Sequence, residues 1–198
     1  MNVGHTIAID VALLLPEPVV ARVVALNRIL SARGQNLRLD GSHLPHITLA
    51  QQFVAGANLP GLLAAVAGIA RAERPFELQV RGVLRQATAL TLAIAHSEPL
   101  QRLHESLMGA LAGFEETACG ESSFLSGGEE IRPNDVDWVA HYSSRSSFGR
   151  YQPHITIGHG ELTGPVKPLD FVADQLAVCH LGRYCTCRAV LAEWRLGQ

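Results

Sequence analysis

The sequence predicts an α+β fold made of two related halves. Two observations support this prediction: strand-like and helix-like apolar patterns alternate along the 198 residues, and one four-residue string occurs twice. The composition is ordinary for a globular protein, with 47% hydrophobic and 17% charged residues. A chain of this length can bury a full core, so we expect a single domain over residues 1–198.

The first half of the chain predicts a strand, a helix, a second strand and a second helix. Residues 6–15 are mostly apolar and typical of a buried strand, and apolar residues at helical spacing follow Pro16. Gly34 fits the end of this first helix. The first copy of the repeated string opens a strand that extends to Val54, and Asn58 is the expected N-cap of the second helix. The expected buried face of that helix consists of Leu62, Leu63, Val66 and Ile69.

The second half predicts a hairpin of strands over residues 76–84 and 89–95, followed by a third helix that begins after Ser97. One face of that helix carries Leu100, Leu103, Leu107 and Leu111. Two closing strands are expected over residues 171–180 and 186–196, joined around Gly182.

Residues 115–150 are rich in glycine, serine and acidic residues and show little periodicity. We expect a long loop here, with a short strand over residues 137–140 and with Trp138, His141 and Tyr142 as its anchors. Long loops often act as lids, so this segment is a candidate lid over a cleft. A surface insertion without a role explains the composition equally well.

The repeated string is Pro-His-Ile-Thr, at residues 45–48 and again at 153–156, with the two histidines 108 positions apart (154 − 46). Isoleucine and threonine favour extended backbone, and proline commonly opens a strand. Residues two apart in a strand face the same side, at roughly 6.5–7 Å, so one phosphoryl group could contact both the histidine and the threonine of a copy. The side chains expected to face outward are His46, Thr48, His154 and Thr156, and those expected in the core are Ile47, Leu49, Ile155 and Ile157.

Two imidazoles and two hydroxyls that met across a cleft would suit phosphodiester cleavage without a metal. A neutral histidine takes a proton from the attacking oxygen, and a protonated one gives a proton to the departing oxygen. Histidine serves both tasks near neutral pH because its ordinary pKa is about 6.5. Thr48 and Thr156 would donate hydrogen bonds to the phosphoryl oxygens. The sequence leaves open which histidine is the base.

With its two HxT motifs, the chain resembles the 2H phosphoesterase superfamily, and most closely the branch of RNA 2′,3′-cyclic phosphodiesterases and 2′-5′ RNA ligases. The resemblance implies a bilobal, pseudo-two-fold fold in which two mostly antiparallel sheets face a central cleft and helices pack outside. It implies a cyclic phosphodiesterase with His46 and His154 as catalytic residues, Thr48 and Thr156 on the substrate phosphate, and no cofactor or metal. Its substrate would be an RNA end or a nucleotide with a cyclic phosphate.

The charge argues against a long nucleic-acid footprint, because the net charge is −2 and the pI is about 6.5. We expect a local phosphate site and no extended nucleic-acid surface. The sequence contains neither a recognisable secretory signal nor an apolar run long enough for a membrane span. We therefore expect a cytoplasmic monomer whose cysteines, Cys119, Cys179, Cys185 and Cys187, are free thiols.

Three alternatives remain open at this stage. The same catalytic set can run in reverse as a 2′-5′ RNA ligase. A cleft of this kind can also bind a nucleotide or another phosphate without turnover. Lastly, His43 and His159 could join the two motif histidines around zinc, although His43 and His46 fall on opposite faces of a regular strand. A position at the rim of the cleft or on the surface is the simpler expectation for His43 and His159.

Arg150 and Tyr151 directly precede the second motif and are candidate substrate contacts. The structural alternative is that Tyr151 packs on the sheet and Arg150 is solvated.

Overall fold

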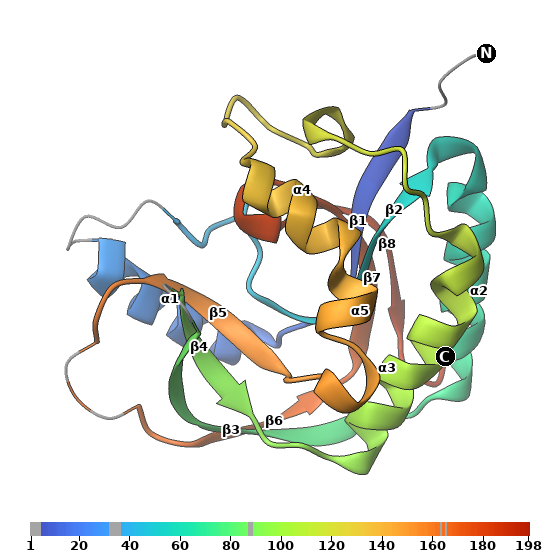
Figure 1. The fold of residues 1–198 in the computed structure, drawn as a ribbon. Coiled ribbons are helices and arrows are strands. Elements are labelled where there is room, and N and C mark those ends of the chain that lie inside the picture. The colour runs from blue at the N-terminus through green and yellow to red at the C-terminus, as the bar shows by residue number, and fades with distance from the viewer. Residues whose placement is uncertain (1–4, 32–36, 87–88, 163, 165) are drawn as a thin grey trace.

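The computed structural model describes residues 5–31, 37–86, 89–162, 164 and 166–198 and contains two four-stranded sheets with helices around them (Figure 1). The strand orders are β2-β1-β7-β8 and β5-β4-β3-β6, and every neighbouring pair is antiparallel. This architecture confirms the predicted α+β class.

The first sheet is formed by β1 (Thr6–Leu14), β2 (His46–Ala55), β7 (Gln175–Leu181) and β8 (Cys187–Arg195). The second is formed by β3 (Phe76–Gln86), β4 (Ala89–Ile94), β5 (His154–His159) and β6 (Leu169–Ala173). The α-helices are α1 (Glu17–Ser31), α2 (Leu59–Ala72), α3 (Glu98–Leu111), α4 (Pro133–Ala140) and α5 (Tyr142–Arg145). Short 3₁₀ turns are η1 (Gly56–Asn58), η2 (Ala112–Phe114), η3 (Glu121–Ser123), η4 (Phe148–Arg150) and η5 (Arg183–Cys185).

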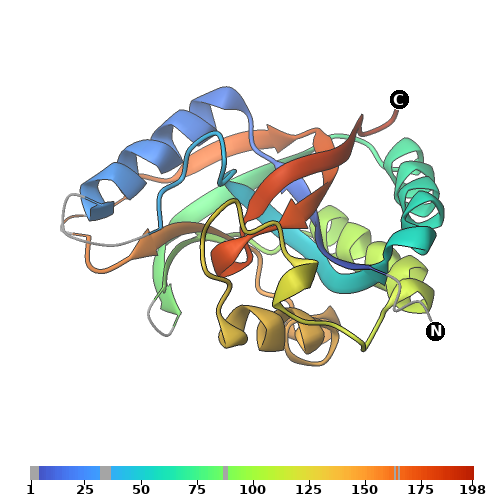
Figure 2. The same cartoon turned by 90° about the horizontal axis from the view of Figure 1, so that it is seen from above.

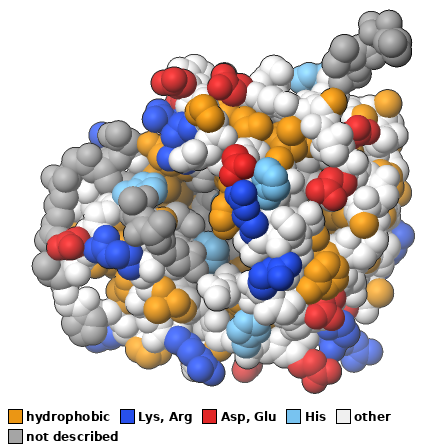
Figure 3. Space-filling model, viewed as in Figure 1, with side chains coloured by type: hydrophobic (Ala, Val, Ile, Leu, Met, Phe, Trp, Pro, Cys, Tyr) orange, Lys and Arg blue, Asp and Glu red, His pale blue; other side chains and the backbone are white. Residues whose placement is uncertain are grey.

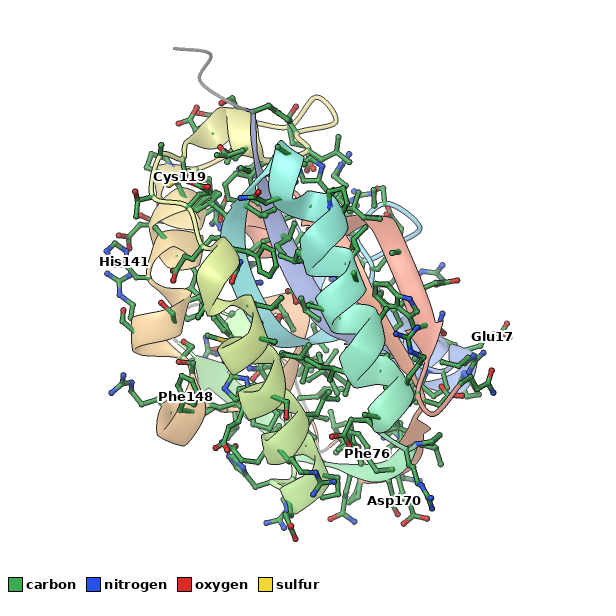
Figure 4. The ribbon with its side chains drawn as sticks, turned by 90° about the vertical axis from the view of Figure 1, so that its right-hand side faces the viewer. Glu17, Phe76, Cys119, His141, Phe148 and Asp170 are labelled. Atoms are coloured by element: carbon green, nitrogen blue, oxygen red, sulfur yellow. The ribbon has the colours of Figure 1, made fainter. Side chains whose placement is uncertain are left out.

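The helices cover both sheets from opposite sides of the molecule (Figures 1 and 2). Helices α2 and α3 lie side by side against the first sheet, where α3 contacts β2 and α2 contacts β8 (Figure 4). Helix α1 follows β1 in the chain but packs against β5 of the second sheet. Within the part of the chain that the structure describes, no helix is long and apolar enough to cross a membrane.

The apolar face of α3 is buried as its spacing predicts, with Leu100, Leu103, Leu107 and Leu111 at most 1% exposed. In α2 the fully buried residues are Leu62, Val66 and Ala70, whereas Leu63 and Ile69 are only partly covered. Asn58 occupies the N-cap position of α2, but its side chain makes no capping hydrogen bond.

Asn27 joins α1 to the second sheet through a buried set of hydrogen bonds. Its Nδ2 donates to the carbonyl oxygens of Leu37 and Ile157, each at 2.9 Å. Its Oδ1 accepts the backbone N–H of Leu39 at 3.0 Å. Both ends of the buried amide are therefore satisfied, as a polar group in a core requires. Gly34, the predicted helix end, lies outside the described residues.

One continuous core runs beneath both sheets. The alternation predicted for the two repeated motifs is correct, because Ile47, Leu49, Ile155 and Ile157 all belong to this core and are 0% exposed. The outward-facing histidines and threonines of both motifs are therefore held in place by the same apolar core.

The predicted short strand over residues 137–140 is wrong, because these residues belong to helix α4. The expectation of a long irregular segment over residues 115–150 is also wrong, since α4, α5 and two 3₁₀ turns form there. Pro133 in the first turn of α4 gives a helix start. Of the expected anchors, Tyr142 is 4% exposed, whereas Trp138 and the His141 side chain are 41% and 50% exposed.

The predicted single strand over residues 171–180 is wrong, because the chain changes sheets at Asp174. Ala173 of β6 pairs with Phe76, whereas Gln175 of β7 pairs with Leu14 of the first sheet. An apolar run of this kind specifies extended, buried backbone without specifying its partner strand. The last predicted strand, over residues 186–196, agrees with β8 to within one residue at each end.

The packing of α3 predicts a large loss of stability on replacement of Leu103 by alanine. This side chain is 0% exposed, so we expect the free energy of unfolding to fall by about 2–5 kcal/mol, from lost burial and the cavity left behind. Leu84→Ala is the matched control, because Leu84 is 52% exposed and should change stability by about 0.5 kcal/mol or less. Urea denaturation of both variants measures the difference, and equal losses would contradict the assigned core.

Candidate active site

The two motif strands occupy the same position in their respective sheets. Strand β2 lies at the edge of the first sheet beside β1, and β5 lies at the edge of the second beside β4. The two edge strands contact each other. Each sheet thus presents its motif at the same boundary between the two halves.

Both motif strands also carry a β-bulge at the same place. Val11 pairs with Ala50 and Ala12 with Thr48, so Leu49 is the extra residue in β2. In the second sheet Leu90 pairs with Gly158 and Thr91 with Thr156, so Ile157 is the extra residue in β5. A bulge shifts the alternation of faces by one residue. The next side chains on the outward faces are consequently Gln51 and His159.

These outward faces line one cleft of about 790 Å³. Figure 3 shows this face of the molecule hollowed near its centre, with histidine side chains visible there. The cleft residues that the sequence predicted are His46, Thr48, Arg150, Tyr151, His154 and Thr156. The structure therefore brings all six predicted site residues to one cavity. Further lining residues include Gln51, Arg132, Trp138, Arg145, His159 and Tyr184.

The two motif histidines are held in the same way. The Nδ1 of His46 lies 2.7 Å from the carbonyl oxygen of Leu44, and the Nδ1 of His154 lies 2.8 Å from that of Gln152. A carbonyl oxygen only accepts, so each Nδ1 carries a proton. This contact orients both rings and leaves both Nε2 atoms as the reactive nitrogens.

Asp10 is a site residue that the sequence analysis missed. It lies in the middle of β1, is 0% exposed, and its Oδ2 is 3.4 Å from the Nε2 of His46. The same oxygen accepts hydrogen bonds from the Thr48 hydroxyl and the Gln51 amide, each at 2.7 Å. The sequence did contain a signal for it, because Asp10 is a single carboxylate within a long apolar run. Acidic residues are rarely buried unless they have hydrogen-bond or ion-pair partners.

The surroundings of the two histidines shift their pKa values in opposite directions. Burial alone would lower the pKa of His46, but the hydrogen bond to Asp10 and the charge of Asp10 raise it above 6.5. Burial lowers the pKa of His154 below 6.5, and the nearby His46 lowers it further, against the opposing effects of the Gln152 carbonyl and of the Asp10 charge.

Tyr151 forms part of the wall beneath the motifs. It is 4% exposed, and its hydroxyl donates to the carbonyl oxygen of Thr48 at 2.9 Å. Its ring stacks on that of His104, with centroids 3.9 Å apart, and His104 in turn accepts the backbone N–H of Phe148 at 2.8 Å. These contacts fix the segment that leads into the second motif.

The three arginines that line the cleft differ in their partners. Arg132 pairs with Asp135 through two nitrogens, and Arg145 pairs with Asp137. Arg150 is exposed and forms no ion pair among the residues that the structure describes.

A metal centre made of four histidines is not formed by the residues that the structure describes. His43 is buried in a separate cluster, with its Nε2 2.9 Å from Glu129 Oε2, so the expectation of a rim or surface position is wrong for this residue. Arg188 also contacts this carboxylate, at 2.7 Å. These contacts satisfy the buried imidazole and tie it to the chain around residue 129, away from the motif histidines.

Among the described residues, Asp10, His46 and Cys187 do form one compact set of donor atoms, within 4.8 Å of one another. The carboxylate and the imidazole already contact each other in it. Burial, a hydrogen bond with Cys179 and the charge of Asp10 raise the pKa of the Cys187 thiol well above 9.0. A metal ligand needs the deprotonated thiolate, so this environment opposes metal binding. All four cysteines are free.

Comparison with known structures gives the same fold at low sequence identity. The TT0787 protein of Thermus thermophilus has a TM-score of 0.59 and 21% identity, with 96% of this chain and 98% of that chain covered. The E. coli LigT structures complexed with phosphate and with 3′-AMP have TM-scores of 0.60 and 0.61 and identities of 16% and 15%. Both cover 98% of this chain and 99% of LigT.

No curated protein matches the chain in sequence. A family model described as the 2′-5′ RNA ligase superfamily matches residues 16–183, which include both HxT motifs and most of the chain. The chain therefore belongs to the 2′-5′ RNA ligase superfamily of 2H phosphoesterases.

Proposed function

We propose that this protein is a phosphodiesterase that opens 2′,3′-cyclic phosphates of RNA ends or nucleotides, with His46 and His154 as its general acid/base pair. The observation that carries the proposal is the placement of both HxT motifs on the wall of one cleft, with each Nδ1 held by a carbonyl oxygen. Each such proton transfer accelerates a reaction by about 10²–10⁴-fold. The reaction needs no cofactor or metal.

The cleft suits a compact phosphate ester. Its volume of about 790 Å³ is within the range for small-molecule sites, and its wall combines imidazoles, hydroxyls and aromatic rings. Among similar folds, LigT structures are complexed with phosphate, 3′-AMP and ATP. We infer that the present cleft takes a nucleotide phosphate of similar size, and that no extended nucleic-acid surface is needed.

Arg150 is the proposed cation for the substrate phosphates. It lines the cleft and has no carboxylate partner in the described part of the chain, whereas Arg132 and Arg145 are each paired with an aspartate. A guanidinium that is not already neutralised is available for bidentate binding of a phosphate. Tyr151 lines the same cleft and supports the first motif strand through its bond to Thr48, and we propose that it contacts substrate from this position.

Two other activities use the same residues. Ligation is the reverse of ring opening, and dilute water favours opening. A phosphate-binding module without turnover would need no acid/base pair, so it does not explain why two histidines are held with their Nε2 atoms available. Incubation with 2′,3′-cyclic AMP followed by chromatography separates these possibilities, because a binding module leaves the nucleotide intact.

The first prediction concerns the two histidines. His46→Ala and His154→Ala should each reduce kcat for 2′,3′-cyclic AMP by at least about 100-fold, because each removes one proton transfer. His141→Ala, at an exposed position at the end of α4, is the matched control and should keep wild-type activity. Wild-type activity should also persist in EDTA. Substantial activity in either motif variant would rule out the two-histidine mechanism.

The second prediction concerns the two threonines. Thr156→Val should reduce kcat by roughly 10- to 100-fold, the effect of one lost hydrogen bond to a charged group, with little change in folding. Thr48→Val should in addition destabilise the protein, because the Thr48 hydroxyl donates to buried Asp10 whereas Thr156 makes no such bond among the described residues. Steady-state kinetics and urea denaturation of both variants test this difference. Equal stability of the two would show that the Thr48–Asp10 bond contributes nothing.

A further inference from the structure

The two halves of the cleft differ at one equivalent pair of residues. In the first sheet Asp10 lies opposite Gln51, the first outward residue beyond the bulge of β2. In the second sheet Ala89 lies opposite His159, the first outward residue beyond the bulge of β5. The motif histidine of the first sheet therefore has a carboxylate against it, whereas the second sheet has only an alanine at the position equivalent to Asp10.

The contacts of Asp10 are those of a hydrogen-bond acceptor. The Thr48 hydroxyl and the Gln51 amide nitrogen both donate to its Oδ2. Its Oδ1 is buried and has no hydrogen-bond partner among the residues that the structure describes. A fully buried carboxylate with only these two neutral donors is stabilised by a cation beside it.

His46 is the group that supplies this positive charge. The side chains that face it are Asp10 from β1, Cys179 from β7, Cys187 from β8 and His154 across the cleft from β5. A thiol cannot carry positive charge, and His154 forms no ion pair with Asp10 among the described contacts. Among the described residues, the ion pair that the carboxylate forms is therefore with His46.

The contacts of His46 favour a proton on both ring nitrogens. Its Nδ1 donates to the Leu44 carbonyl oxygen, and its Nε2 faces the Asp10 carboxylate at 3.4 Å, where a lone pair would be repelled. The Nδ1 of His154 likewise donates to a carbonyl oxygen, but no carboxylate lies against its Nε2 among the described residues. His154 can thus keep a lone pair directed into the cleft.

We propose, on the basis of the function proposed above, that Asp10 is a positioning residue that holds the acid proton on His46, so that His46 is the general acid and His154 the general base in ring opening. The Nε2 of His154 takes a proton from water as the water oxygen bonds to phosphorus. The phosphorus–oxygen bond to one ribose oxygen breaks, and the Nε2 proton of His46 passes to that oxygen. Water is added across one bond, and proton exchange with solvent restores both rings.

The first experiment follows the two imidazoles by NMR in the wild-type protein without substrate. Spectra of His46→Gln and His154→Gln assign the two ring signals, and a pH titration then follows each of them. His46 should keep its second proton to a higher pH than His154, as the opposite shifts of their pKa values also indicate. The reverse order, or two coincident titrations, would overturn the proposal. Because no turnover is measured, the result stands even if cyclic phosphates are not the substrate.

The second experiment compares Asp10→Asn with the wild type across the pH range. In the wild type, kcat should rise as His154 loses its proton and fall as His46 loses its proton. In Asp10→Asn the fall in kcat should move to lower pH. We expect kcat to be lower than in the wild type by on the order of 10-fold at pH 8 and by less at pH 6, because general acid catalysis accelerates such a step by roughly 10²–10⁴-fold. Asp10→Glu should restore part of the wild-type profile.

Asp170→Asn is the matched control, because this carboxylate lies on β6 in the other sheet and bonds only Gln79 among the described side chains. It should leave the pH profile unchanged. If Asp10→Asn lowered kcat by the same factor at every pH and left the titration of the His46 ring signal unchanged, Asp10 would have a purely structural role and the proposal would be overturned. If Asp10→Asn fails to fold, the wild-type titration alone decides.

Discussion

The candidate site depends on the register of two edge strands over one shared core. Ile47 and Leu49 of β2, and Ile155 and Ile157 of β5, are fully buried in that core, and this burial turns the histidine and threonine of each motif outward. A slip of one residue in either strand would bury an imidazole and expose an isoleucine. The apolar residues of the motif therefore fix the direction of its reactive residues.

The bulges extend this constraint beyond the motifs. Each inserts one apolar residue directly after the threonine, so that two successive core residues follow it and the outward face resumes at Gln51 or His159. Without the bulge in β2, Ala50 would face Asp10 in place of Gln51, and the carboxylate would lose one of its two short hydrogen bonds. The bulge in β2 thus places Gln51 beside the buried Asp10, on the same outward face as the histidine and the threonine.

Much of this organisation could be predicted from the sequence, because it is encoded locally. The outward and inward residues of both motifs follow from strand alternation, and the buried face of α3 follows from the spacing of its leucines. The change of sheet at Asp174 could not be predicted in this way, because partner choice depends on residues far away in the chain. Helix α4 was missed for a related reason: its polar, aspartate-containing sequence has weak periodicity, and packing against β2 stabilises it.

Asp10 was missed although its residue type was visible, because a strand prediction gives the face of a side chain without its neighbours. Its importance lies in the asymmetry that it brings to a site with two similar halves. If two histidines titrated identically, at most about one quarter of the molecules would have one particular ring protonated and the other neutral. A carboxylate against His46, with only an alanine at the equivalent position of the second sheet, separates the two titrations. The productive state can then dominate between the two pKa values. Two copies of one motif become an acid and a base through a difference in the strand beside them.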